Sequence, residues 1–301
     1  MTVVDLDTRR REKIGGSEAA SACGVDPYRS RIMLWAEKTG RVERPQTEAM
    51  RWGTLLEPVV FQELERQGFD VMPAPDVEWQ HENVRWMTGH VDGFVDIEGQ
   101  RGVLEIKTAN AFAGHDWTSD AGAPLPYLVQ VHHYMAITGC EVGLLACLVG
   151  GQRLELRTVT RDHGVTLAMI DREGALLDYV RTDRPPPPDG SDSAKDAIRA
   201  LYPESSGKTI RLDRETWEAC KALKARKEQL DVVKRQAAEL QQKIELAMGD
   251  AEQAVSPFDT PAARWPSVQS TRLDSKALKA ARPDVWSEFA VPTSTRRFTV
   301  E

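Results

Sequence analysis

The amino-acid sequence predicts an α/β fold: a central mixed β-sheet flanked by helices, followed by a helical, coiled-coil-like arm and a short tail. Three observations indicate this. Strand-like and helix-like apolar patterns alternate over residues 1–183. Four consecutive prolines within 184–190 rule out a continuing helix or central strand and predict a stiff connector. Residues 191–301 then include a long stretch rich in Ala, Leu, Lys, Glu and Gln, which is typical of a helix.

The elements of the first part can be assigned in chain order. Ser17 is predicted to cap a short helix that ends at Cys23. Apolar residues at helical spacing predict a helix over 50–67, which Gly68 terminates. Alternation and turn residues predict strands at 69–72, 77–80, 84–88, 91–97 and 102–108. A helix at 126–138, a hairpin of 142–149 with 153–160, and a helix at 165–180 complete the domain.

The arm has a heptad pattern within the helix predicted over 213–254. Two sets of apolar residues, each spaced by seven and offset by three, occupy a and d positions: Leu230, Ala237 and Ile244, then Val233, Leu240 and Ala247. One interpretation is an antiparallel helical arm packed on its own chain, and the other is a contact with another molecule. The first is favoured because sustained coiled coils usually need more heptads than these. A short helix over 275–281 is expected in the tail.

Composition excludes several classes of protein. With 301 residues and 41% hydrophobic side chains, the chain can build a core, which excludes wholesale disorder. Its longest apolar run, 142–149, is too short to span a bilayer. The charged N-terminus has no apolar segment typical of a secretory signal, so a cytoplasmic location is expected. The net charge of −7 counts at first sight against a nucleic-acid partner, but the placement of the basic residues matters more than the total.

Two further kinds of site are not expected. The four cysteines, Cys23, Cys140, Cys147 and Cys220, lack the spacing of a disulfide framework or a metal cluster. The glycine-rich motifs that bind ATP or dinucleotides are also absent from the sequence.

The chemically informative stretch contains Asp92, Glu105 and Lys107. Strand alternation places Glu105 and Lys107 on one face, and a hairpin could bring Asp92 beside them. Two carboxylates and a strand carbonyl form an all-oxygen site that suits Mg²⁺ or Mn²⁺. A lysine beside them can orient an attacking water or stabilise charge on a phosphate, which is metal-assisted phosphodiester hydrolysis. The alternative is a plain salt bridge at a strand end of an unrelated α/β protein.

The spacing Asp92-x(12)-Glu105-x-Lys107 resembles the signature of the PD-(D/E)xK nuclease superfamily, with Val91 in place of the usual proline. Three more segments, in the order found in phage-type alkaline exonucleases of the YqaJ-like and lambda exonuclease group, resemble motifs of that group: 14–19, 52–58 and 127–135. The resemblance covers about residues 1–182 and implies a restriction-endonuclease-like core.

The resemblance also implies roles for individual residues. Metal ligands would be Asp92, Glu105 and the Ile106 backbone carbonyl, and Glu57 would complete the metal shell or hold a second ion. Lys107 would position the attacking water, and Gln130 would lie near the active centre. The DNA 5′-phosphate would be held by Arg10 and Ser17. His90 stands where the lambda-type enzyme has a small hydroxyl residue, which changes the expected phosphate pocket.

By the same resemblance, the function expected is that of a Mg²⁺- or Mn²⁺-dependent exonuclease, with one or two ions, that degrades one strand of linear duplex DNA from 5′ to 3′. The remaining 3′ overhangs would serve recombination by a single-strand annealing partner. A homo-oligomeric ring, with a trimer favoured, and a phage or prophage origin in a bacterial cytoplasm are also implied. The alternatives are an endonuclease of the same superfamily, restriction-like or junction-resolving, and a non-catalytic protein that binds DNA ends.

Overall fold

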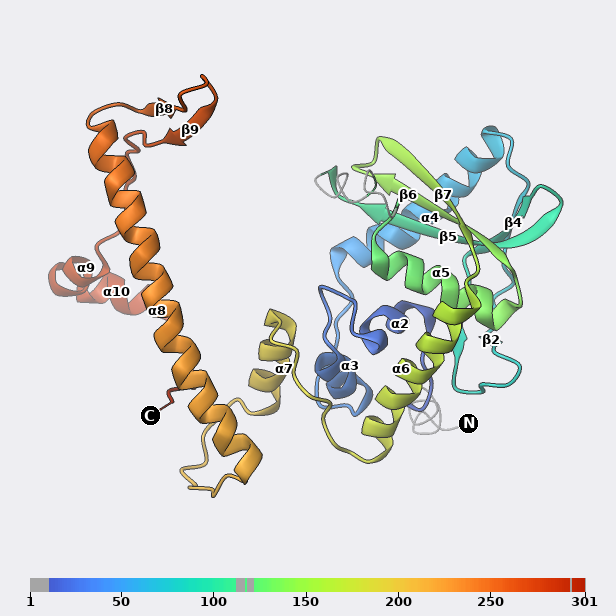
Figure 1. Cartoon of the computed structure of the whole chain (residues 1–301). Helices are drawn as coiled ribbons and strands as arrows, with labels where there is room; N and C mark the ends of the chain where they lie inside the picture. The colour runs from blue at the N-terminus through green and yellow to red at the C-terminus, as the bar shows by residue number, and fades with distance from the viewer. Residues whose placement is uncertain (1–10, 112–116, 118–121, 293, 301) are drawn as a thin grey trace. The chain divides into compact units, whose positions relative to one another are not determined.

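A computed structural model describes residues 11–111, 117, 122–292 and 294–300. The chain divides into two compact units, Met1–Tyr202 and Pro203–Glu301, which are treated separately below. The first contains the predicted mixed sheet with its flanking helices (Figure 1). Among the described residues, no helix combines the length and apolar character that crossing a membrane requires.

The central sheet has five strands in the order β1-β4-β5-β6-β7: Val71–Pro73, Gly93–Ile97, Gln100–Ala109, Val142–Val149 and Arg153–Thr160. Its neighbouring strands are antiparallel except for β5 and β6, which are parallel. Helix α5, Leu125–Thr138, lies in the crossover between these two strands, as a parallel connection requires. A two-residue turn with positive φ at Glu98 and Gly99 closes the β4–β5 hairpin. Strands β2, Trp79–Gln80, and β3, Thr88–Gly89, form a separate pair.

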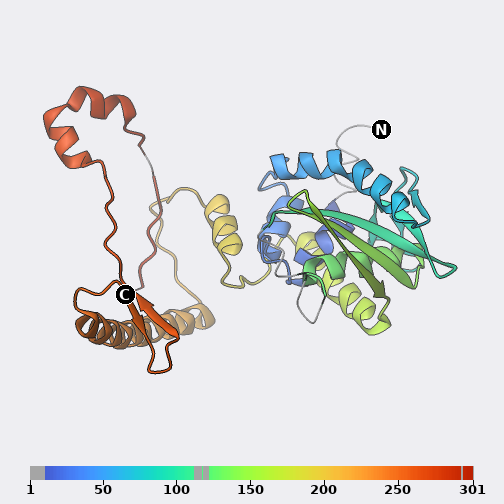
Figure 2. The ribbon, with the colours of Figure 1, turned by 90° about the horizontal axis from the view of Figure 1, so that it is seen from above.

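Helices cover both faces of the sheet. Val103 on one face packs in a core with residues of α5, of α2 (Gly16–Cys23) and of α6 (His163–Arg181). Leu104 and Ile106 on the other face pack against α4 (Glu48–Arg66). Figure 2 shows α4 and α5 on opposite sides of the sheet. This alternation along β5 is the one predicted from the sequence.

The first unit extends beyond the predicted boundary at residue 183. Helix α7, Asp192–Leu201, follows the proline segment and buries Ala194 and Ala197. These alanines share a core with Leu34 of helix α3 (Arg31–Lys38) and with Leu176 of α6. The four prolines therefore join two elements of one unit, and the division of the chain falls between Tyr202 and Pro203.

The second unit is built on helix α8, Arg214–Met248, which ends six residues before the predicted limit. The hairpin of β8, Gln253–Val255, and β9, Pro261–Arg264, follows, and then come α9, Ser275–Ala281, and α10, Pro283–Phe289. None of the described residues of this unit, 203–292 and 294–300, is buried. The heptad face of α8 is therefore not buried by other described residues of the second unit. The predicted packing of the arm on its own chain is not seen within the described part of this unit.

Candidate active site

The β4–β5 hairpin places Asp92 beside the strand that carries Glu105 and Lys107. Strand β4 begins at Gly93, which pairs with Leu104, so β5 has no β4 neighbour beyond that pair. The Asp92 carboxylate takes the place of the missing strand, and its Oδ2 accepts a hydrogen bond of 2.8 Å from the Ile106 amide. Since the N–H and C=O of one strand residue point to the same side, the Ile106 carbonyl also faces Asp92.

Glu105 is the most buried carboxylate of this cluster, with 1% of its surface exposed. Its Oε1 accepts a hydrogen bond of 2.6 Å from the Gln130 amide and lies 2.5 Å from the Lys107 ammonium. Its Oε2 is also buried and has no hydrogen-bond partner among the described residues. A buried carboxylate oxygen without a partner is costly, so this atom favours a further cation or donor at the site.

Helix α4 brings a third carboxylate, Glu57, to the same cavity. The cavity has a volume of about 360 Å³. Six residues that were predicted to act together line it: Glu57, Asp92, Glu105, Ile106, Lys107 and Gln130. The structure therefore brings together the predicted metal and catalytic residues, although they come from β5, α4, α5 and the residue before β4.

The charges of this cluster influence one another. Burial raises the pKa of Glu105 to about 8, with a further contribution from Asp92 that Lys107 opposes. Burial also raises the pKa of Asp92, and burial together with the Asp92 charge raises the pKa of Glu57. For Lys107, burial lowers the pKa, but the Glu105 and Asp92 carboxylates outweigh it and the pKa rises. The protein alone thus disfavours three ionised carboxylates here, and a cation would relieve their repulsion.

The donor set fits a hard divalent cation. Carboxylate and carbonyl oxygens are the ligands of Mg²⁺ and Mn²⁺, and the unpartnered Glu105 Oε2 is one of them. Within the described part of the chain, no three His, Cys, Asp or Glu side chains are gathered closely enough to enclose an ion by themselves. Mg²⁺ is typically held by one or two carboxylates together with waters and substrate phosphates, so the arrangement suits this ion better than zinc.

Tyr134 lies in the segment 127–135 that resembles a motif of the exonuclease group, in which the resemblance gives a role only to Gln130. The Gln130 amide that contacts Glu105 also donates a hydrogen bond of 3.1 Å to the Tyr134 hydroxyl. The buried Tyr134 ring leaves no room for a side chain at two glycines: a Cβ would lie 2.2 Å from it at Gly16 and 2.8 Å at Gly89. Gly16 lies at the start of α2 and Gly89 lies in β3. In the sequence, these two glycines are the signal that an aromatic ring packs directly against the backbone there.

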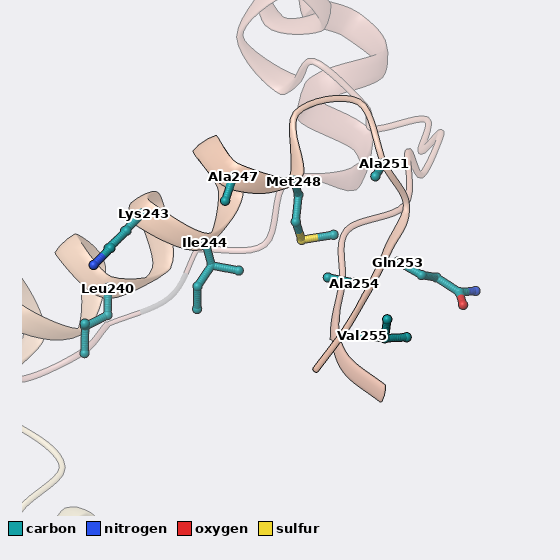
Figure 3. Close-up of a pocket in the computed structure, with 9 residues that line it drawn as sticks. All are labelled: Leu240, Lys243, Ile244, Ala247, Met248, Ala251, Gln253, Ala254 and Val255. Atoms are coloured by element: carbon teal, nitrogen blue, oxygen red, sulfur yellow. The ribbon is translucent and has the colours of Figure 1, made fainter. Parts of the chain in front are cut away.

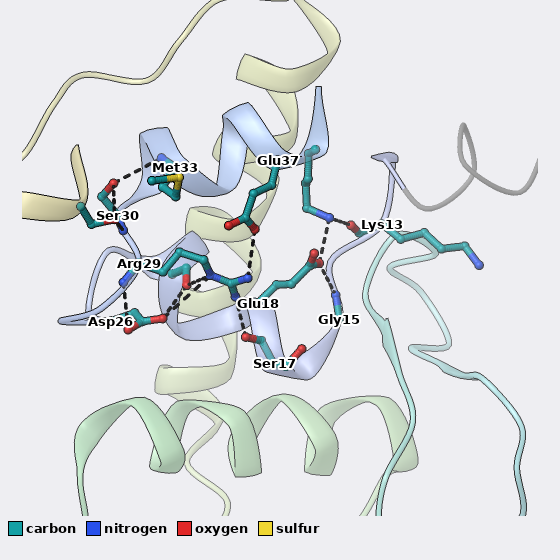
Figure 4. Close-up of polar contacts among 12 residues, drawn as sticks. Lys13, Gly15, Ser17, Glu18, Asp26, Arg29, Ser30, Met33 and Glu37 are labelled. Carbon is teal, nitrogen blue, oxygen red and sulfur yellow. Dashed lines mark hydrogen bonds and ion pairs between the residues drawn. The ribbon is translucent and has the colours of Figure 1, made fainter. Parts of the chain in front are cut away.

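Ser17 lies apart from the carboxylate cavity, and Arg10 lies outside the described residues. The prediction that Ser17 caps a helix is wrong. The N-cap of α2 is Gly15, whose amide donates a hydrogen bond of 2.9 Å to the Glu18 carboxylate three residues later. Ser17 therefore lies in the first turn of α2, exposed, and its carbonyl accepts a hydrogen bond of 2.7 Å from Arg29 (Figure 4).

A second cavity, of about 660 Å³, adjoins the first through Met50, which lines both. Its wall carries Ser17, four basic side chains (Arg11, Arg29, Lys38 and Arg44) and three glutamates (Glu18, Glu37 and Glu43). Arg29 and Lys38 are buried, and Figure 4 shows Arg29 between Ser17, Asp26 and Glu37. Lys38 is 2.8 Å from the Glu18 carboxylate. The sequence analysis did not identify Lys38, because a single lysine near a helix end is usually a solvated charge.

Comparisons with known proteins are consistent with the predicted family. A model of the YqaJ-like viral recombinase domain matches residues 6–141. The uncharacterized protein YqaJ of Bacillus subtilis (strain 168) is 31% identical over 298 residues, which cover 97% of this chain and 92% of that protein.

Two solved structures are also similar. An alkaline exonuclease from Laribacter hongkongensis is 18% identical with a TM-score of 0.49, over 66% of this chain and 100% of that one. A phage-related exonuclease from Haemophilus somnus 129PT is 13% identical with a TM-score of 0.46, over 56% of this chain and 94% of that one. The assignment rests on the first two comparisons: the chain belongs to the YqaJ-like viral recombinase family.

Proposed function

We propose that the protein is a Mg²⁺- or Mn²⁺-dependent deoxyribonuclease that degrades one strand of linear duplex DNA from 5′ to 3′. One observation carries the proposal: in a member of a viral recombinase family, Asp92, Glu105 and Lys107 meet at one cavity, with an unpartnered carboxylate oxygen among them.

The chemistry is hydrolysis of a phosphodiester by in-line attack of water. Asp92, Glu105 and the Ile106 carbonyl would hold one divalent ion, with Glu57 completing the shell or holding a second. The bound ion would polarise the phosphate and favour ionisation of the attacking water. The Lys107 ammonium, fixed by its contact with Glu105 Oε1, would orient that water and offset charge on the phosphate. Gln130 would keep the Glu105 carboxylate in place through its hydrogen bond.

Recognition of the DNA end would involve the second cavity. Ser17 lines it with four basic side chains, and guanidinium and ammonium groups suit phosphate oxygens. Arg10, whose sequence position precedes these residues, would contribute to the same 5′-phosphate site. Such a site next to the carboxylate cavity supports processing from an end. The 3′ overhangs would then be passed to a single-strand annealing protein for phage-type recombination.

A closed homo-oligomeric ring, with a trimer favoured, would keep the enzyme on its DNA and make digestion processive. The protein would act in the cytoplasm of a bacterial host that carries the phage or prophage.

Digestion of linear duplex labelled at either the 5′ or the 3′ end tests the proposal. With Mg²⁺, the 5′ label should be released first, and chelation should stop the reaction. Asp92→Asn, Lys107→Ala and Glu57→Gln should each lower the rate at least about a hundredfold, since each removes an electrostatic contact at the reacting phosphate. Glu65→Gln is the matched control for Glu57→Gln because Glu65 is exposed on the same helix, and it should digest DNA at the wild-type rate.

The same assay separates the alternatives. Covalently closed circular duplex should stay intact, whereas an endonuclease of the superfamily would nick it. DNA-end binding without any digestion would indicate a non-catalytic protein. Full activity in both Asp92→Asn and Lys107→Ala would contradict the proposed site itself.

A further inference from the structure

Helix α8 carries an uncovered apolar stripe, which we call the heptad seam: Leu230, Val233, Ala237, Leu240, Ile244 and Ala247. Its large members are exposed, with Leu240 at 64% and Val233 at 58%. Exposed apolar stripes of this length on a helix are typical of surfaces that another element covers. The described part of the second unit buries no residue of this stripe, although the β8 segment borders its C-terminal end.

The seam ends in a cavity of about 630 Å³ at the C-terminal end of α8 (Figure 3). Leu240, Ile244 and Met248 line it from the helix, and Ala254 and Val255 line it from the β8 segment. The seam and cavity are continuous, since Leu240, Ile244 and Ala247 belong to both. A helix that lies along the seam would thus find a recess for an apolar side chain at this end.

The charges beside the seam indicate what kind of helix it would accept. In a coiled coil the e and g positions flank the seam and select the partner. From 227 to 243 these positions hold three lysines and three glutamines: Lys227, Gln229, Lys234, Gln236, Gln241 and Lys243. The acidic residues of the same stretch, Glu228, Asp231 and Glu239, occupy the b, c and f positions on the outer side.

Two of these lysines have contacts, but neither contact neutralises the positive charge of the e and g positions. Lys234 is 3.9 Å from Asp231, but both side chains are exposed, and such pairs contribute little. Lys227 lies 5.9 Å from the centre of the Phe298 ring, a contact that adds no negative charge. If a second copy of α8 lay on this seam, the flanking positions of both helices would hold only lysine and glutamine, so no opposite charges would meet. Arg226 adds further positive charge near the start of the seam.

We propose that the heptad seam of α8 is a docking surface for an amphipathic helix of another protein, with leucine-like residues on one face and acidic residues flanking them. The apolar faces would pack as knobs into holes, and glutamates of the partner would face Lys227, Lys234 and Lys243. This role is independent of the nuclease activity proposed above. The partner's chemistry follows from the positive flank, because a helix with lysine at its e and g positions would be repelled.

Binding of two designed peptides to the full-length protein tests the proposal. Both are 28-residue helices with leucine at a and d, one with glutamate and the other with lysine at every e and g position. Fluorescence anisotropy should show the acidic peptide binding at least roughly tenfold more tightly than the basic one, because the contacts of the three flanking lysines change from attractive to repulsive. Exchanging Lys227, Lys234 and Lys243 for glutamate should reverse this preference.

The apolar part of the surface has a matched control on the same helix. Leu240→Ser with Ile244→Ser should weaken binding of the acidic peptide at least roughly tenfold, because two large apolar contacts are lost. Leu246→Ser should leave binding unchanged, since Leu246 is 86% exposed on the outer side. Circular dichroism should show the same helix content in both variants.

Several results would overturn the proposal. Equal affinity for both peptides, or no binding of either, would exclude an acidic helix as the occupant. An oligomer that dissociates in Leu240→Ser/Ile244→Ser but not in Leu246→Ser would show that a second copy covers the seam. Duplex DNA that competes with the peptide and binds the serine variants as well as the wild type would show a purely electrostatic surface.

Discussion

The two units of this protein differ in the way they use apolar side chains. The first buries a core on both sides of its sheet, including Leu104, Leu145 and Leu176. The second exposes its large apolar residues, among them Trp217, Leu240 and Phe258, and buries none of those described. Burial of apolar surface is the main source of folding free energy, so a unit without it gains little from tertiary packing. The difference predicts that the first unit can fold alone, whereas the second gains little stability from its own packing.

Separating the units should have the largest effect. A chain of residues 1–202 should keep a near-ultraviolet circular dichroism signal and unfold in one sharp urea transition. A chain of residues 203–301 should show helix in the far ultraviolet but melt gradually, because nothing in it is buried. A sharp, cooperative transition of the 203–301 chain at low concentration would break the comparison.

The same substitution in the two units should have different costs. Leu145→Ala, in the core beside β5, should lower the free energy of unfolding by about 2–5 kcal/mol, since it leaves a cavity. Leu240→Ala, on the exposed seam of α8, should change it by less than about 0.5 kcal/mol. Urea unfolding of the full chain measures both. Similar losses would mean that α8 is packed as tightly as the sheet.

Glycine substitutions test how tightly the first unit is packed around the site. Gly16→Ala should cost about 1–3 kcal/mol and reduce nuclease activity, because the new Cβ would collide with the Tyr134 ring. Gly174→Ala is the control: its Cβ would lie 3.5 Å from Trp86, an ordinary contact, and alanine favours the interior of α6 by up to about 1 kcal/mol. Thermal unfolding and the digestion assay report the two effects. A neutral Gly16→Ala would show that the Tyr134 ring can move.

The smallest expected effect is a pH dependence confined to the first unit. His133 and Glu173 form a fully buried pair with an Nδ1–Oε1 distance of 3.0 Å. Burial lowers the pKa of His133, but the Glu173 carboxylate and the Thr88 carbonyl outweigh it, so its pKa lies above the ordinary value. The pair's stabilisation is therefore full below about pH 6.5 and is lost as pH rises through the raised pKa.

Urea unfolding from about pH 5.5 to pH 9 should show this decline in wild type. A chain with His133→Gln and Glu173→Gln should lack it, because neither side chain then titrates. The same slope in both proteins would assign it to other groups.

The sequence predicted the fold where the pattern was regular. Helix α5 and the β6–β7 hairpin lie within a residue or two of their expected bounds, because their apolar patterns are long. Helices α3 and α7 were not predicted. Each is short, and α7 follows four prolines that indicated the end of the domain. What joins α7 to the unit is burial of two alanines, which are too small to produce a clear apolar pattern.

The candidate site could be predicted in part for a similar reason. Asp92, Glu105 and Lys107 are close in sequence, so one hairpin brings them together. The contribution of Glu57 depended on the resemblance to the family, because an acidic residue on an amphipathic helix is usually solvated. Tyr134 contacts Gln130, and Lys38 contacts Glu18; these contacts are visible only in the packed structure.

The hydrogen bond from the Ile106 amide to Asp92 has a consequence for handling the protein. Where β5 runs past the start of β4, its backbone would otherwise be an open edge on which another molecule could add a strand. The Asp92 side chain occupies that edge and brings a negative charge to it. The Asp92 carboxylate thus takes the place of a neighbouring strand at this edge of the sheet. An inactive protein for crystallisation with DNA is therefore better made as Asp92→Asn, which keeps an acceptor for the amide, than as Asp92→Ala.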